Sequence, residues 1–120
     1  MAKVYYDKGV SLDILKKKTV AVIGYGAQGR AQALNLRDSG IKVIVSELEG
    51  TLNYKMAEKD GFQPLGAYEA SKKADVIHIL TQDTIQPLVY EKYILPNLKK
   101  GKAIGFSHGF NIHFNQIIPP

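Results

Sequence analysis

The chain contains no cysteine and no tryptophan, and it has no long hydrophobic run. Without cysteine it can form neither a disulfide nor a thiolate metal site, which fits a reducing, cytoplasmic environment. Its apolar runs are too short to cross a bilayer, and residues Met1 to Asp7 lack the apolar core of a signal peptide. These absences argue against a membrane protein and against a disulfide-stabilised secreted domain.

The overall composition is that of one soluble globular domain. Of the 120 residues, 45% are hydrophobic and 22% are charged, which are ordinary values for a protein with its own core. The net charge is +5, but the lysines are scattered except at Lys16–Lys18 and around Lys99–Lys102. Both clusters directly precede expected strands, where lysines usually form a solvated rim. We therefore expect no nucleic acid among the partners.

A glycine motif follows the apolar run Val20–Ile23. An unbroken Val/Ile-rich run is typical of a buried parallel strand, and Gly24, Gly26 and Gly29 then form the pattern Gly-x-Gly-x-x-Gly. The first glycine of this pattern makes a tight turn, the second lets a pyrophosphate approach the backbone, and the third lets the next helix pack on the strand. The free N–H groups at the start of that helix face the phosphates. The motif therefore predicts a nucleotide site.

Strand and helix patterns alternate along the chain, without repeats or linkers. This alternation predicts an α/β fold with a doubly wound, mostly parallel sheet of the Rossmann type. The second half-sheet is incomplete, so we expect residues 1–120 to form a partial domain in which Asn111–Pro120 is a connector. The expected strands are Thr19–Gly24, Lys42–Ser46, Asp75–Leu80 and Lys102–Phe106, with a poor one at Gln63–Pro64. The expected helices are Ala27–Ser39, with Ala31, Leu34 and Leu36 buried, and Thr51–Asp60, Ala67–Lys73 and Ile85–Leu98.

The loops that follow the strands carry the polar and glycine-rich residues. Since parallel strands joined by right-handed crossovers end at the same edge of the sheet, these loops should converge there, where such sheets bind ligands. The converging loops are Gly24–Gln28, Glu47–Asn53, Thr81–Gln86 and Ser107–Asn111.

Two stretches together resemble the ketol-acid reductoisomerase family. Residues 24–40 are similar to its glycine loop and first helix, and Ser107–Phe114 is similar to its His-Gly-Phe-Asn-Ile segment. Val4–Asp7 and Pro96–Lys99 also resemble it. The resemblance implies an enzyme of branched-chain amino-acid biosynthesis, which rearranges a 2-acetohydroxy acid with magnesium. The product is then reduced by NADPH, or in some members by NADH, to a 2,3-dihydroxy acid.

The resemblance also implies what this chain lacks. In the family, a helical, knotted C-terminal domain supplies the carboxylates that bind magnesium, and a lysine-bearing segment follows the His-Gly-Phe-Asn-Ile motif. Both are absent here, so we expect no metal ligands and no turnover by the isolated chain. The acetohydroxy acid should bind only with the missing domain. Two alternatives stay open: a free-standing nicotinamide-binding or sensing module, and a truncated fragment. We expect a homo-oligomer that associates through the edge of strand Lys102–Phe106 or through the tail.

His108 is the candidate catalytic residue, a role that the resemblance implies. Imidazole titrates near neutral pH and can exchange protons with an alkoxide or a metal-bound water. The alternative is a loop histidine that only hydrogen-bonds the backbone. His78, inside an apolar strand, is expected to be a core histidine, and His113 a connector residue.

The loop Ser46–Asn53 decides between NADH and NADPH. Leu48 stands where the family usually has an arginine that holds the 2′-phosphate, and Thr51 and Asn53 lie at its serine positions. Glu47 lies close to the spacing from Gly29 at which an acidic residue bonds an unphosphorylated ribose, and its charge would repel a 2′-phosphate. We expect a preference for NADH. The alternative is that Thr51, Asn53 and Lys55 still hold NADPH.

The remaining candidates lie in the glycine loop and after the strand Asp75–Leu80. Asp83 is expected to cap the next helix through its side chain, while its loop contacts the cofactor. Adenine stacking by Tyr5, Tyr6 or Tyr54 is weighed against a role in covering the sheet edge. The expected cofactor-binding residues are Gly24, Tyr25, Gly26, Ala27, Gln28, Gly29, Glu47, Leu48, Thr51, Asn53, Asp83, Thr84, Ile85 and Gln86.

Overall fold

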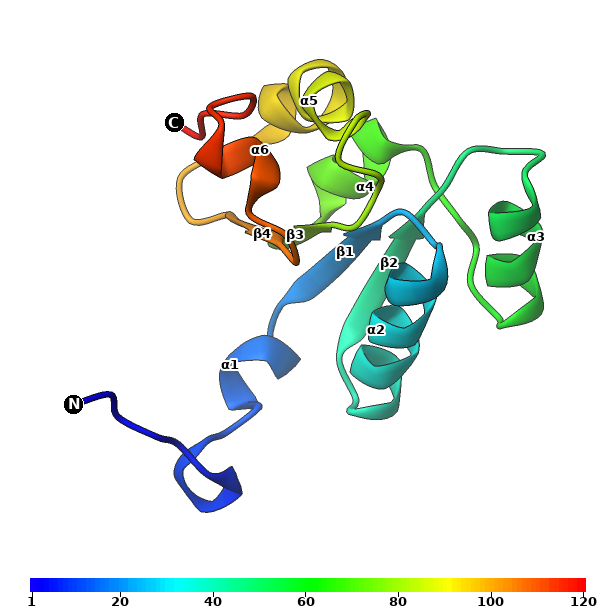
Figure 1. Cartoon of the computed structure of the whole chain (residues 1–120). Helices are drawn as coiled ribbons and strands as arrows, with labels where there is room; N and C mark the ends of the chain where they lie inside the picture. The colour runs from blue at the N-terminus through cyan, green and yellow to red at the C-terminus, as the bar shows by residue number, and fades with distance from the viewer.

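A computed structural model describes all 120 residues, and it contains one parallel four-stranded sheet with helices on both faces (Figure 1). The strand order is β2-β1-β3-β4, and every pair in it is parallel. The strands are β1 (Thr19–Ile23), β2 (Lys42–Ser46), β3 (Val76–Ile79) and β4 (Ala103–Phe106). The predicted α/β fold with a doubly wound parallel sheet is confirmed, and β4 lies at one edge as expected.

The poor strand predicted at Gln63–Pro64 is reduced to a single bridge. Leu65 pairs in parallel with Ser46, on the outer side of β2. The Leu65 N–H donates to the Val45 carbonyl at 2.9 Å, and the Leu65 carbonyl accepts from the Glu47 N–H at 3.3 Å. Proline has no N–H to give to a ladder, so pairing cannot extend back through Pro64.

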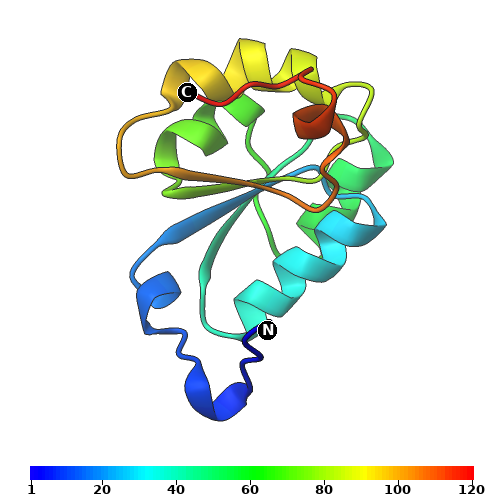
Figure 2. The same cartoon turned by 60° about the vertical axis from the view of Figure 1, so that its left-hand side comes forward.

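Two helical layers sandwich the sheet (Figures 1 and 2). The helices α2 (Ala27–Asp38) and α3 (Leu52–Lys59) cover one face, while α4 (Ala67–Lys73) and α5 (Gln86–Val89) cover the other. Three short elements lie at the ends of the chain: η1 (Asp7–Gly9), α1 (Asp13–Lys16) and α6 (Phe110–His113). No helix is both long and apolar enough to cross a membrane.

Strand β1 carries a buried side chain on each face. Ala21 and Ile23 belong to the core under α4, whereas Val22 belongs to the core under α2 and α3. Successive strand residues point to opposite faces, and both faces are covered here. That double coverage is why the sequence of β1 is apolar without alternation.

Helix α2 turns a different face to the sheet from the one predicted. Gly29 and Ala33 are its buried residues, Leu34 and Leu36 are half-buried, and Ala31 is exposed. The prediction for Ala31 is therefore wrong. Gly29 and Ala33 are four residues apart and lie on the same side of a helix. The close approach at Gly29 directs that side to the sheet.

The segment predicted as one helix, Ile85–Leu98, is divided. After α5 come a π-helical turn, η2 (Tyr90–Ile94), and a 3-10 turn, η3 (Leu95–Asn97). Pro96 has no N–H to continue the α-helical ladder. The Asn97 side-chain amide, donating to the Tyr93 and Tyr68 carbonyls at 3.0 Å each, secures the end of this segment instead.

The tail is more ordered than the connector that the sequence predicts. Its first residues form α6, and Ile117 is 2% exposed within the core under α4. Figure 2 shows the tail, in red, running along the front of the helical layer that contains α5, in yellow. A buried isoleucine anchors Asn111–Pro120 to the domain, which an open connector would not need.

Candidate nucleotide-binding site

A cleft of about 260 Å³ lies at the edge of the sheet where the parallel strands end. Three of the four predicted loops meet there, those after β1, β2 and β3. Of the predicted cofactor residues, Gly24, Glu47, Leu48 and Ile85 line it. The other lining residues are Ile23, Ser46, Gly66, Ala67, Tyr68, Thr81, Val89 and Tyr93.

Two glycines of the motif are required by the backbone itself. Gly24 has φ +102°, and a Cβ there would also lie 3.0 Å from the Leu80 carbonyl carbon. At Gly29, a Cβ would lie only 1.9 Å from the Gly24 carbonyl oxygen. These contacts match the tight turn and the close helix–strand packing expected of the first and third glycines.

The middle glycine is required by neither conformation nor packing. Gly26 has φ −75°, and nothing lies within 4 Å of the position that a Cβ would take. It is the N-cap of α2, and no side chain caps that end. The first N–H groups of a helix have no partner within it. The loop is therefore open on the side where a phosphate could approach.

Glu47 joins the end of β2 to the glycine loop. Its carboxylate accepts hydrogen bonds from the Tyr25 N–H at 2.8 Å and from the Leu48 N–H at 3.0 Å. These bonds hold the negative charge in the wall of the cleft, next to the motif. Leu48, the next residue, is 71% exposed and has no side-chain donor for a phosphate.

A network under the glycine loop holds Tyr25 in place. Its hydroxyl donates to Asp60 at 2.7 Å, and Asp60 forms an ion pair with Arg30 at 2.8 Å. Burial, followed by the Asp60 carboxylate, raises the pKa of Tyr25 to about 12. Hydrogen bonds from Arg30 and then Tyr25 lower the pKa of Asp60 to about 2. Arg30 is thus paired with Asp60, and Tyr25 can offer a ligand only its backbone.

Thr51 and Asn53 are placed differently from the residues that line the cleft. The Thr51 hydroxyl caps α3 by accepting from the Tyr54 N–H at 3.2 Å, and it donates to the Leu48 carbonyl at 2.7 Å. Asn53 is exposed on α3. Neither residue lines the cleft, and their contact with a cofactor stays a prediction.

The loop after β3 is tied together internally. Asp83 does not cap α5, whose N-cap is Ile85 without any side-chain bond, so that prediction is wrong. The Gln86 side chain is 3% exposed; it donates to the Thr81 carbonyl at 2.7 Å and accepts from Asn111 at 2.9 Å. Asp83 and Thr84 line a separate hollow with Phe110 and Phe114. Contact of Asp83, Thr84 and Gln86 with a cofactor stays a prediction.

Sequence reasoning missed three polar or aromatic residues of the cleft: Thr81, Tyr68 and Tyr93. The Thr81 hydroxyl oxygen is buried without any hydrogen-bond partner. The tyrosines weighed for stacking lie elsewhere, since Tyr5 and Tyr6 are 63% and 75% exposed in the N-terminal arm and Tyr54 is on α3. The sequence does place Thr81 in a converging loop, although not among the cofactor-binding residues, whereas the two tyrosines carry no local signal.

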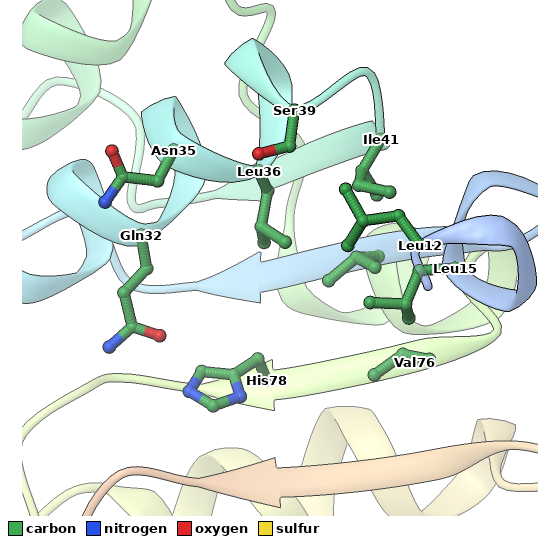
Figure 3. A pocket seen from close by; sticks show the side chains of 10 residues that line it. Leu12, Leu15, Gln32, Asn35, Leu36, Ser39, Ile41, Val76 and His78 are labelled. Atoms are coloured by element: carbon green, nitrogen blue, oxygen red, sulfur yellow. The ribbon is translucent and has the colours of Figure 1, made fainter. Parts of the chain in front are cut away.

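The three histidines have different surroundings. His108 is exposed in the loop after β4, at the edge where the strands end, and its catalytic role stays a prediction. His113 is exposed at the end of α6. His78 is half-buried and lines a groove of about 420 Å³ beside α2 (Figure 3), so the prediction of a core histidine is wrong. Burial lowers its pKa.

No group of three or more His, Cys, Asp or Glu side chains is arranged to hold a metal ion. The cleft and its glycine loop present backbone N–H groups, one acidic side chain, one free hydroxyl and two phenol rings.

The parallel sheet, the glycine turn into α2 and the acidic residue at the end of β2 together define a Rossmann-type nucleotide-binding domain. A solved semialdehyde dehydrogenase NAD-binding protein from Cupriavidus necator, in complex with calcium and NAD, shares this fold. The match has a TM-score of 0.75 at 20% identity, over 86% of this chain and 37% of the solved chain.

Residues 14–120 match the family model described as acetohydroxy acid isomeroreductase, NADPH-binding domain, and the chain belongs to that family. It is 58% identical over its whole length to the ketol-acid reductoisomerase (NADP(+)) of Pyrococcus abyssi (strain GE5 / Orsay), of which it covers 36%. The structure of a NADH-preferring ketol-acid reductoisomerase from an uncultured archean has a TM-score of 0.93 at 48% identity, over 99% of this chain and 38% of that one. The chain thus spans little more than a third of these relatives.

Proposed function

We propose that this chain binds a nicotinamide dinucleotide as the cofactor-binding part of a ketol-acid reductoisomerase. The observation that carries the proposal is Gly26, which lies where the helix starts and has open space in front of its α-carbon. Neither strain nor packing explains a glycine there, whereas an approaching pyrophosphate does. The glycine loop and the N-terminus of α2 would hold the phosphates.

The cleft offers groups for the adenosine half. Glu47 stands at the end of β2, where an acidic side chain bonds ribose hydroxyls, and the unpartnered Thr81 hydroxyl can bond a further polar atom. Tyr68 and Tyr93 supply aromatic surface for a base. When bound, the dihydronicotinamide supplies a hydride for the reduction, while this chain binds and orients it.

We propose further that NADH is preferred to NADPH. The Glu47 carboxylate is fixed by two backbone donors, so it cannot easily turn away from a 2′-phosphate. Leu48 offers no compensating charge, and the Thr51 hydroxyl is engaged in capping α3. Like charges a few ångströms apart at a protein surface repel by about 1 kcal/mol or more.

The reaction of the whole enzyme is proposed by membership of the family. It comprises the magnesium-dependent alkyl shift of a 2-acetohydroxy acid and its reduction to a 2,3-dihydroxy acid, with His108 as a catalytic residue. The carboxylates for magnesium would come from outside these 120 residues. Acetolactate turnover with magnesium and NADH should therefore require an added C-terminal fragment, and turnover by this chain alone would contradict the assignment.

Calorimetric titration with NADH and NADPH tests the binding proposal. We expect the Gly26→Ala chain to keep its fold by circular dichroism but to lose about tenfold or more in affinity for either dinucleotide. Gly9→Ala is the matched control, because Gly9 also has open space around it but lies far from the cleft. Tighter binding of NADPH than of NADH by the unaltered chain would contradict the cofactor preference alone.

A further inference from the structure

A chain of three side chains connects α2, β3 and the loop after β4. The Gln32 side-chain amide donates to the Ser107 hydroxyl at 3.2 Å, and the same hydroxyl lies 3.1 Å from Nε2 of His78. These residues are far apart in sequence and come from three different elements. None of them belongs to the cleft described above.

The sheet register explains why His78 can reach Ser107. His78 pairs with Val22 on one side and with Gly105 on the other, so it lies on the face of the sheet that α2 covers. A Cβ on Gly105 would lie 2.8 Å from Nδ1 of His78. The missing side chain of Gly105 therefore leaves room for the ring beside β4, and Figure 3 shows Gln32 reaching down from α2 toward it.

The hydrogen bonds among Gln32, Ser107 and His78 can all be made with the donors running in one direction, from Gln32 through Ser107 to His78. A hydroxyl has one proton and two lone pairs. Ser107 accepts from Gln32 and so has its own proton free to donate to Nε2 of His78. Half-burial lowers the pKa of His78, which favours the neutral ring that such a bond requires.

The three hydrogen-bonded side chains lie at the part of the sheet edge where the second half of a dinucleotide would bind. In this fold, the ligand crosses the carboxyl edge of the sheet, with its adenosine half beside the acidic residue after β2. The other half then extends over the ends of β3 and β4. Ser107 is the first residue after β4, and Gln32 is on the helix that begins at the phosphate loop.

We propose that Gln32, Ser107 and His78 are positioning residues, which hold the loop 107–109 against α2 and so shape the nicotinamide half of the site. This inference rests on the proposed function. Without the Ser107 hydroxyl, the loop loses its bonds to two elements and its place relative to α2 is no longer set. Binding of the adenosine half should not change, because none of the three residues lines the cleft that would hold it.

The test compares NADH with ADP-ribose, which lacks the nicotinamide ring, by calorimetric titration. Ser107→Ala should weaken NADH about three- to tenfold, the range expected for lost hydrogen bonds, and should leave ADP-ribose within about twofold. It should also reduce the change in dihydronicotinamide fluorescence on binding. Ser107→Thr keeps the hydroxyl and should restore both the NADH affinity and the fluorescence change. The NADH affinity of His78→Gln should lie between that of His78→Leu and that of the unaltered chain. Ser39→Ala, an exposed hydroxyl on the same groove, is the matched control.

The outcomes separate the two proposals. Equal weakening of NADH and ADP-ribose by Ser107→Ala, or no effect on either, would overturn the positioning role while leaving dinucleotide binding in place. Failure of the unaltered chain to bind either ligand would overturn the proposed function and this inference with it.

Discussion

The two halves of the sheet differ in how one face is covered. Around β1 and β2, α2 and α3 cover Val22 and Val45, which are 0% and 1% exposed. On the same face of β3, Val76 and His78 are half-buried and line an open groove. The glycine loop and the end of β2 are thus backed by a closed core and a network of charges. The opposite side depends on a few hydrogen bonds, and disturbing the two sides should have effects of different size.

The largest effect is expected at Gly29, on the closed side. Gly29→Ala would place a Cβ against the Gly24 carbonyl oxygen, and α2 could accommodate it only by moving away from β1. Overpacking of this kind costs about 1–3 kcal/mol or more, so the midpoint of urea unfolding should fall and dinucleotide binding should be lost. Gly9→Ala, with no neighbour within 4 Å and outside the cleft, is the control. Unchanged stability of Gly29→Ala would show that the closed side is more pliable than its contacts indicate.

The cofactor preference should change with one charge. Glu47→Gln removes the negative charge from the cleft wall while keeping an oxygen that can accept from Tyr25. The ratio of NADPH to NADH affinity should rise about fivefold to tenfold, which corresponds to about 1 kcal/mol. Calorimetry with both dinucleotides measures it. Glu49→Gln, an exposed carboxylate two residues on, should leave the ratio unchanged, and an equal change in both variants would mean that general charge decides the preference.

Acid should weaken the network beneath the glycine loop. The pKa of Asp60 is lower in the folded chain than the ordinary 3.8, so its ionised form stabilises the fold above that value. This contribution is lost as the pH falls toward about 2. Asp60→Asn should flatten the dependence of the unfolding temperature on pH between about 4 and 2. Asp38→Asn, at an exposed position of α2, is the control and should not. If the unfolding temperatures of Asp60→Asn and of the unaltered chain fell equally with pH, the network would not contribute to the difference between the two sides.

The smallest effect is expected at His78, on the open side. Its pKa is lower in the folded chain than the ordinary 6.5 because burial disfavours the charged ring. The neutral ring therefore favours folding above pH 6.5, and this advantage declines as the pH falls below that value. His78→Gln should have a smaller loss of stability between about pH 7 and 5, measured by urea unfolding. His113→Gln is the exposed control, and equal slopes for both variants would contradict a special environment at His78.

Local patterns predicted the backbone of this domain well. The ranges Lys42–Ser46 and Ala67–Lys73 are the observed bounds of β2 and α4. Helix α3 ends shortly before Gly61, the predicted stop, which has φ +95°. The predictions failed where the position of a side chain depends on contacts with other parts of the structure. Ala31 is exposed because the close contact at Gly29 sets the rotation of α2. Asp83 does not cap α5 because that helix begins later, at Gln86.

The nucleotide loop and the parallel sheet can be predicted from sequence, because a glycine turn after an apolar strand is a local property of a few adjacent residues. Which side chains share the cleft depends on how the elements pack in three dimensions. The bond from Tyr25 to Glu47 spans 22 residues and that from His78 to Ser107 spans 29, and Thr81, Tyr68 and Tyr93 meet around one cavity. These long-range contacts depend on the strand order and on helix packing, which cannot be read from any short segment of the sequence.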